Sequence, residues 1–180
     1  EKAKIEQEER EVKAQEIEMM LDDLLDAALD GNIEVFEWME GDSSFDINWA
    51  NGNRFNGHGN TYLITASYNG HAALVKYLLD RGALVDKRNK LGFTALYCAL
   101  ANNRVEVMRL LLERNADPNL QPYDEEKFAP RLYIAAQDNF LEACELLLRY
   151  GANLDAKFKG FTALQIATHK NNTQAIKVLQ

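Results

Sequence analysis

Residues 94–119 read TALYCALANNRVEVMRLLLERNADPN, and this stretch decides the fold. Apolar residues recur at helical spacing on both sides of Asn102-Asn103, a dipeptide that favours a turn. Thr94 stands where its hydroxyl can accept an N–H of the first helical turn. Asn115, like a glycine, tolerates the left-handed conformation that ends many helices. The stretch therefore predicts two short helices joined by a tight turn.

The same pattern recurs along the chain. Related copies start at Thr61, Thr94, Pro130 and Thr162, so the intervals are 33, 36 and 32 residues. A degenerate copy starts near Asp22, and its link to the next copy is about six residues longer than the usual period. One copy cannot bury its own apolar face, whereas stacked copies bury a continuous one. The period predicts a helical-repeat solenoid.

In these features the chain resembles the ankyrin repeat family. The shared features are a Thr-x-Leu-x-x-Ala start, a Gly or Asn turn, a Leu-Leu run and a terminal Gly-Ala, and Asn69-Gly70-His71 matches the family's turn closely. Pro130 replaces the capping Thr of its copy, so that helix should lack a hydroxyl cap. The resemblance implies an all-α solenoid of about five repeats with loop or hairpin tips over residues 22–180. The copies would start near 22, 61, 94, 130 and 162, after a charged N-terminal helix at 1–21.

The N-terminal segment differs from the repeats. Glu1–Met20 is rich in Glu, Lys, Ala and Gln, and no helix breaker occurs before Gly31, so we expect a helix that continues into the first copy. Ile5, Val12 and Met19 are spaced seven apart, which is too short a series to define a coiled coil. Two interpretations stay open: a solvated helix with a weak apolar edge, or a helix that packs on another subunit or coiled coil.

Composition narrows the partner classes. The chain has 180 residues with 28 Asp and Glu against 20 Lys and Arg, a net charge of −8. This balance argues against nucleic-acid binding and disfavours an anionic membrane surface. The only cysteines are Cys98 and Cys144, so we expect a reducing, cytoplasmic location. The chain begins at Glu1 rather than Met and ends within an apolar helical pattern, so we expect it to be a piece of a longer protein.

Motifs for catalysis or metal binding are missing from the sequence. His58, His71 and His169 lack zinc-ligand spacing, and both cysteines lie on apolar helical faces. We therefore expect no enzyme activity and no catalytic, cofactor-binding or metal site, with His71 in a structural turn position.

Two surface features keep alternatives open. Asp22, Asp23, Asp26 and Asp30 form either a solvated face or a patch for a basic partner. Under the family resemblance, Asn119 has the spacing of ankyrin asparagines that a dioxygenase hydroxylates; the alternative is a hairpin asparagine that bonds its own backbone.

The expected function is protein binding or scaffolding through the loop tips and the concave face. The alternatives are a structural subunit of a large assembly, or an accessory domain of a larger enzyme or effector. Phe93 and Phe161 occupy aligned loop positions and either anchor a partner or pack against the next loop. The candidate partner-binding residues are Arg54, Phe55, His58, Asn60, Tyr68, Lys90, Phe93, Asn102, Phe128, Gln137, Phe158, Lys159 and Phe161.

Overall fold

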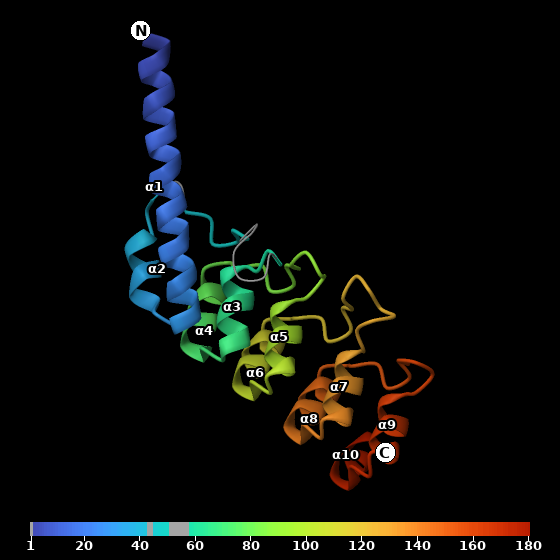
Figure 1. Ribbon diagram of the computed structural model, residues 1–180. Coiled ribbons are helices and arrows are strands. Elements are labelled where there is room, and N and C mark those ends of the chain that lie inside the picture. Colours follow the sequence, from blue (N-terminus) through green and yellow to red (C-terminus); the bar gives the residue numbers. More distant parts are fainter. Residues whose placement is uncertain (1, 43–44, 51–57) are drawn as a thin grey trace.

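The computed structural model describes residues 2–42, 45–50 and 58–180, and ten helices lie within these ranges (Figure 1). They are α1 (Lys2–Asp30), α2 (Ile33–Met39), α3 (Tyr62–Asn69), α4 (Ala72–Asp80), α5 (Ala95–Ala101), α6 (Val105–Glu113), α7 (Arg131–Gln137), α8 (Leu141–Arg149), α9 (Ala163–His169) and α10 (Thr173–Leu179). The described ranges contain no strand longer than an isolated bridge. The expected all-α solenoid is confirmed.

The helices form a stack of successive pairs. In Figure 1 the pairs follow one another from blue to red, and the loops that join α4 to α5, α6 to α7 and α8 to α9 project to the same side. The first helices of neighbouring pairs pack on each other, as α3 does on α5, and so do the second helices, as α4 does on α6. The loop tips and the first helices therefore share one elongated side of the molecule.

Helix starts follow the sequence pattern. The hydroxyls of Thr61, Thr94 and Thr162 each accept the N–H of the residue three positions on, at 3.2, 3.3 and 3.3 Å. Gln165 accepts the N–H of Thr162 in return and completes a capping box. Among the described side chains none caps the start of α7, where Pro130 stands. The predicted caps and the predicted missing cap are both confirmed.

The turn inside each pair needs a left-handed residue. Gly70, Asn103, Asn139 and Asn171 have φ of 89°, 51°, 58° and 59°. Asparagine reaches this region more easily than other side chains, because its short amide can bond locally. The chain reverses at these four positions, so the second helix of each pair lies back against the first.

The core is built from small residues in the first helices and large ones in the second helices. Ala66, Ala99, Ala135 and Ala167 are fully buried, which lets neighbouring first helices approach closely. In the second helices, three aligned leucines are fully buried and the fourth nearly so: Leu78, Leu111, Leu147 and Leu179. Since each apolar face is covered by the next pair, stability depends on stacking.

The long helix α1 belongs to the stack only in its C-terminal part. Residues Leu24, Leu25 and Ala28 are buried, and this part packs against α2 and α3. The N-terminal part extends beyond the stack and carries exposed Val12 and Met19 (Figure 1). The helix continues into the first copy, as expected, and Val12 and Met19 on its apolar edge are uncovered by the described residues.

A partly buried turn contact joins α1 to the second copy. The Nε2 atom of His71 lies 2.6 Å from the carbonyl oxygen of Leu29, close to the end of α1. This contact agrees with the structural role expected for His71. In the part of the chain that the structure describes, no helix is both long and apolar enough to cross a membrane.

Candidate functional site

Three aromatic side chains meet on the loop side of the stack. The ring of Phe93 stacks on that of Tyr97, with 4.6 Å between centroids and 5° between planes. The ring of Phe128 meets Phe93 edge-on at 4.8 Å. Phe93 and Phe128 come from successive loops and Tyr97 from α5, and all three are half-buried. Phe93 thus packs against the next loop, which was one of its two expected roles, while part of the cluster stays accessible.

Arg131 lies beneath this cluster with only 1% of its surface exposed. Its guanidinium carbon is 5.8 Å from the centroid of Tyr97. One terminal nitrogen donates to the hydroxyl of Thr94 at 2.7 Å, and the other donates to the carbonyl oxygens of Leu120 and Pro118. Arg131 therefore joins the cap of α5 to the loop before α7.

The electrostatic setting of Arg131 is unusual. Burial lowers the pKa of its guanidinium to about 10, and the charges of Asp86 and Asp117 act in the opposite direction. The Nε atom has no partner among the residues that the structure describes. Asp86 itself is partly buried, which raises the pKa of its carboxyl group, and it accepts the N–H of Asp117 at 3.2 Å. The side chain thus acts as a hydrogen-bonding support for the loops.

Sequence reasoning missed the role of Arg131, although a signal was present. The residue after the helix cap is buried in every aligned copy: Tyr62, Ala95 and Ala163 occupy this position elsewhere. A charged residue at an aligned buried position must find internal hydrogen bonds, because an unpaired buried charge is costly. In the sequence itself, the signal is that Arg131 is charged where the aligned copies carry the uncharged Tyr62, Ala95 and Ala163.

The loop before α9 forms a hairpin tip. Phe158 pairs with Phe161 in an isolated bridge around Lys159, and the ring of Phe158 meets Tyr133 of α7 at 5.4 Å. Phe161 is 46% exposed, and its ring lies 6.3 Å from that of His169. Phe158 therefore packs onto the preceding pair, whereas Phe161 is the more accessible aromatic.

Two candidates at the far ends of first helices make local contacts. The amide of Asn102 donates to the carbonyl oxygen of Cys98 at 3.1 Å, and that of Gln137 donates to Asp138 at 3.3 Å. Tyr68 is 52% exposed. Of these three, Tyr68 offers the largest apolar surface to a partner.

Two candidates stabilise the loop between the second and third copies. The carbonyl oxygen of His58 accepts the N–H of Lys90 at 2.8 Å, and the side chain of Asn60 accepts from the amide of Asn89 at 2.8 Å. These contacts link the segment before α3 to the loop before α5. The side chain of Lys90 is exposed at the tip. Arg54 and Phe55 lie outside the described residues.

Asn119 ties one loop to the next. Its side-chain amide donates to the carbonyl oxygen of Gly151 at 2.9 Å, and its side-chain oxygen accepts the N–H of Asn153 at 2.8 Å. Its own N–H donates to the carboxylate of Asp117 at 2.8 Å. The side chain of Asn119 thus bonds the backbone of the following copy rather than the backbone of its own hairpin. Its role is structural, as in the second of the two alternatives, but it extends to the next copy.

The thiols show no sign of reactivity. Cys98 and Cys144 are buried, and burial raises their pKa values to about 12 and about 11. A neutral, buried thiol is a poor nucleophile. The described residues contain no cluster of three His, Cys, Asp or Glu side chains that could hold a metal ion.

Comparisons with known proteins agree with the architecture. A family model described as ankyrin repeats (3 copies) matches residues 24–122 and 127–180. The chain is 40% identical over 100 residues to human ankyrin repeat and KH domain-containing protein 1, which covers 56% of this chain and 4% of that protein. It is 35% identical over 127 residues to human transient receptor potential cation channel subfamily A member 1, covering 70% of this chain and 11% of that protein.

A third relative is the bovine mitochondrial disaggregase, which is 33% identical over 123 residues. This match covers 65% of the chain and 17% of the disaggregase. The chain thus spans only a small part of the length of each of these relatives. The likeness extends to the repeats and not to whole proteins.

Proposed function

Because this chain belongs to the ankyrin repeat family, we propose that it binds a protein partner through its loop tips and first helices and catalyses no reaction. Ankyrin repeats are generally protein–protein interaction modules. Fold alone does not define a function, so the proposal depends on the surface that this chain presents.

The aromatic cluster of Phe93, Tyr97 and Phe128 is the observation that carries the proposal. Large aromatic side chains anchor interfaces because they bury much apolar area at a small cost in conformational entropy. Phe93 packs against the core, and its ring contacts with Tyr97 and Phe128 hold the three rings in place before a partner arrives, which lowers the entropic cost of binding. Exposed Phe161 lies on the next loop along the same side.

The chemistry of the chain supports further parts of the proposal. A net charge of −8 supports a protein partner rather than a nucleic acid or an anionic membrane. The two buried, unpaired thiols support an intracellular location. No cofactor enters the proposal.

The test separates the loop side from the opposite face. The chain serves as bait in affinity capture with mass spectrometry, and the affinity of the captured partner is then measured by calorimetry. We expect Phe161→Ala and Tyr68→Ala each to cost about 1 kcal/mol or more of binding free energy, since both side chains are exposed. Matched changes on the second helices, Lys76→Ala and Lys177→Ala, should cost far less.

Folding is followed in parallel by circular dichroism. Phe93→Ala should lower both stability and binding, because its ring also supports the loop. Loss of binding in the second-helix variants alone would place the interface on the opposite face and refute the assignment.

A second candidate function has one specific observation in its favour. The chain covers 4%, 11% and 17% of the three relatives described above. These small shares of the relatives' length favour an accessory domain within a larger protein, in which the repeats would recruit or position a partner. The full-length reading frame tests this directly, because a catalytic or channel domain beside the repeats would support it. A structural subunit of a large assembly remains the other alternative, and long coiled-coil flanks in that frame would favour it.

A further inference from the structure

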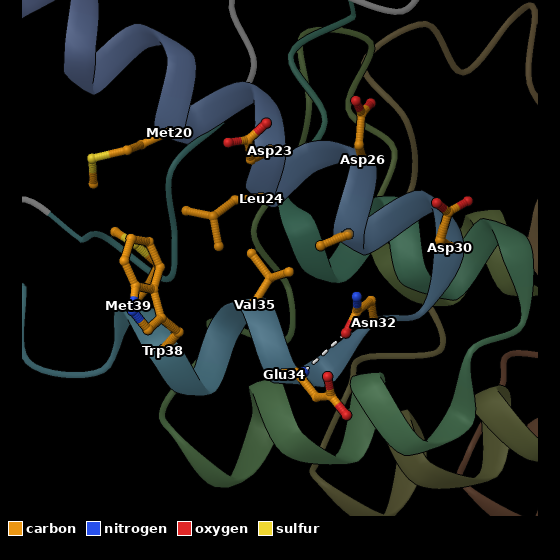
Figure 2. Close-up of a pocket in the computed structure, with 11 residues that line it drawn as sticks. Met20, Asp23, Leu24, Asp26, Asp30, Asn32, Glu34, Val35, Trp38 and Met39 are labelled. Atoms are coloured by element: carbon orange, nitrogen blue, oxygen red, sulfur yellow. Dashed lines mark hydrogen bonds between the residues drawn. The ribbon is translucent and has the colours of Figure 1, made fainter.

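An open groove lies between α1 and α2 at the N-terminal end of the stack (Figure 2). Its volume is about 530 Å³. Leu24 of α1 and Val35 of α2 point toward one another across it, and Met20 and Met39 extend this apolar lining (Figure 2). Trp38, on the same helix as Met39, is 79% exposed. The floor of the groove is therefore apolar: Leu24 and Met39 are buried at its bottom, and Met20, Val35 and Trp38 provide its accessible surface.

Carboxylates surround this floor. Asp23, Asp26 and Asp30 follow one another along α1 at spacings of three and four residues, which places them on one helical face. Glu34 adds a fourth carboxylate from the first turn of α2. All four are exposed, and none of them takes part in the ion pairs found among the described residues. A molecule bound in the groove would thus lie beside these four negative charges.

The position of the groove indicates the shape of its occupant. The helices α1 and α2 pack on α3 and α4, so they cover the end of the following pair. The side of α1 and α2 that faces away from α3 and α4 is the surface on which a further helix of the stack would pack. No helix of the described residues lies there. A groove between two helices accepts a third helix through interlocking rows of side chains.

We propose that the α1–α2 groove binds a basic amphipathic helix of a partner protein. Apolar side chains one turn apart on that helix pack against Met20 and Val35 and cover Trp38, while its lysines or arginines reach the aspartates of α1. Met19 lies one turn before Asp23 on the same face of α1 and extends the apolar contact.

The charge of the chain argues against a second copy as the occupant. A copy carries a net charge of −8, and like charges facing one another across an interface cost binding energy. The groove also lies at the end of the stack, away from the aromatic cluster on the loop side. This inference is therefore independent of the proposed loop-side function.

The test uses the 180-residue chain and a defined probe. The probe is a synthetic helix of about 20 residues with leucines on one face and lysines on the other, and its matched control carries glutamates in place of the lysines. Binding is followed by calorimetry and by tryptophan fluorescence. We expect the lysine helix to bind with an affinity that falls as salt rises, and the glutamate helix to bind at least about tenfold more weakly.

Matched charge variants locate the site. The triple variant Asp23→Asn, Asp26→Asn, Asp30→Asn should weaken the lysine helix at least about tenfold. The triple variant Glu113→Gln, Glu142→Gln, Glu145→Gln removes the same charge from exposed positions of α6 and α8 and should change the affinity by less than about twofold. These side chains are exposed, so both variants should keep the fold, which circular dichroism verifies.

The apolar part of the groove is tested separately. Trp38→Ala should weaken the lysine helix at least about tenfold, since exposed tryptophan is a strong interface anchor. Three outcomes overturn the proposal: no binding of the lysine helix, equal loss in the two triple variants, or self-association of the chain that disappears in Trp38→Ala. The last outcome would assign the groove to a second copy.

Discussion

A single buried arginine holds together the middle of the loop side. Arg131 donates hydrogen bonds to Thr94, Leu120 and Pro118, and it occupies a position where the aligned copies bury uncharged residues. Its desolvation is offset by several hydrogen bonds rather than by one direct ion pair. The residue therefore matters more than a surface arginine.

We predict that Arg131→Ala destabilises the chain by about 2 kcal/mol or more, because an unsatisfied buried acceptor costs ~1–3 kcal/mol. Arg131→Lys should recover only part of this loss, since an ammonium group cannot reach several divergent acceptors as a planar guanidinium does. Arg109, whose side chain is 42% exposed beside Glu106 at 3.6 Å, is the control, and Arg109→Ala should cost under ~0.5 kcal/mol. Urea unfolding followed by circular dichroism measures all three; equal losses at the two positions would contradict the buried role.

We predict that stability falls as pH rises above 9. Burial raises the pKa of Cys98 from 9.0 to about 12 and that of Cys144 to about 11, so the folded state holds protons that the unfolded state releases. This contribution is fully present below pH 9 and is lost as pH rises through 11 to 12. The raised pKa of Tyr62 acts in the same direction.

Urea midpoints measured from pH 7 to pH 11 test the sign of this dependence. The double variant Cys98→Ala, Cys144→Ala should show a shallower decline over that range, whatever its stability at pH 7. A midpoint that rises with pH would contradict the burial of the thiols.

At the scale of one element, α6 shows how a helix of nine residues is held in place. It lies between α4 and α8, and its buried face carries Val107, Met108, Leu111 and Leu112. An isolated helix this short is not stable in water, so its stability comes from these tertiary contacts.

We predict that Leu111→Ala costs about 2–5 kcal/mol through lost transfer free energy and the cavity left behind. The exposed Glu113 of the same helix is the control, and Glu113→Ala should cost under ~0.5 kcal/mol. Equal losses in urea unfolding would show that the register of the repeat alignment is wrong.

The sequence predicted those elements whose pattern is local. The threonine caps, the left-handed turn asparagines and the missing cap at Pro130 all depend on residues within one turn, and the structure bears them out. The edge-on contact of Phe93 with Phe128 and the groove beside Trp38 depend on contacts between separate copies or helices. Spacing along the chain says little about which side chains meet across such gaps.

At the scale of the whole molecule, α1 has two parts with different roles. Its C-terminal part covers α3, whereas its N-terminal part extends beyond the stack (Figure 1). The difference gives a direct test by truncation.

We predict that deletion of residues 1–16 lowers the helical signal in circular dichroism but leaves the urea midpoint nearly unchanged. Deletion of residues 1–31 should lower the midpoint clearly, because it removes buried Leu24, Leu25 and Ala28 and uncovers the apolar face of α3. A fall of the midpoint in the shorter deletion would show that the projecting part of α1 packs on the stack in solution.

The step-by-step stacking of the pairs has a consequence for synthesis on the ribosome. The main contacts join helices within one pair or in successive pairs, so no early pair needs a late one in order to bury its face against a neighbour. Chains with mostly local contacts fold quickly, and repeat arrays can nucleate at one point and propagate. The first pairs can therefore fold while the later ones are still being translated, and the growing end of the stack exposes the apolar face of one pair at a time.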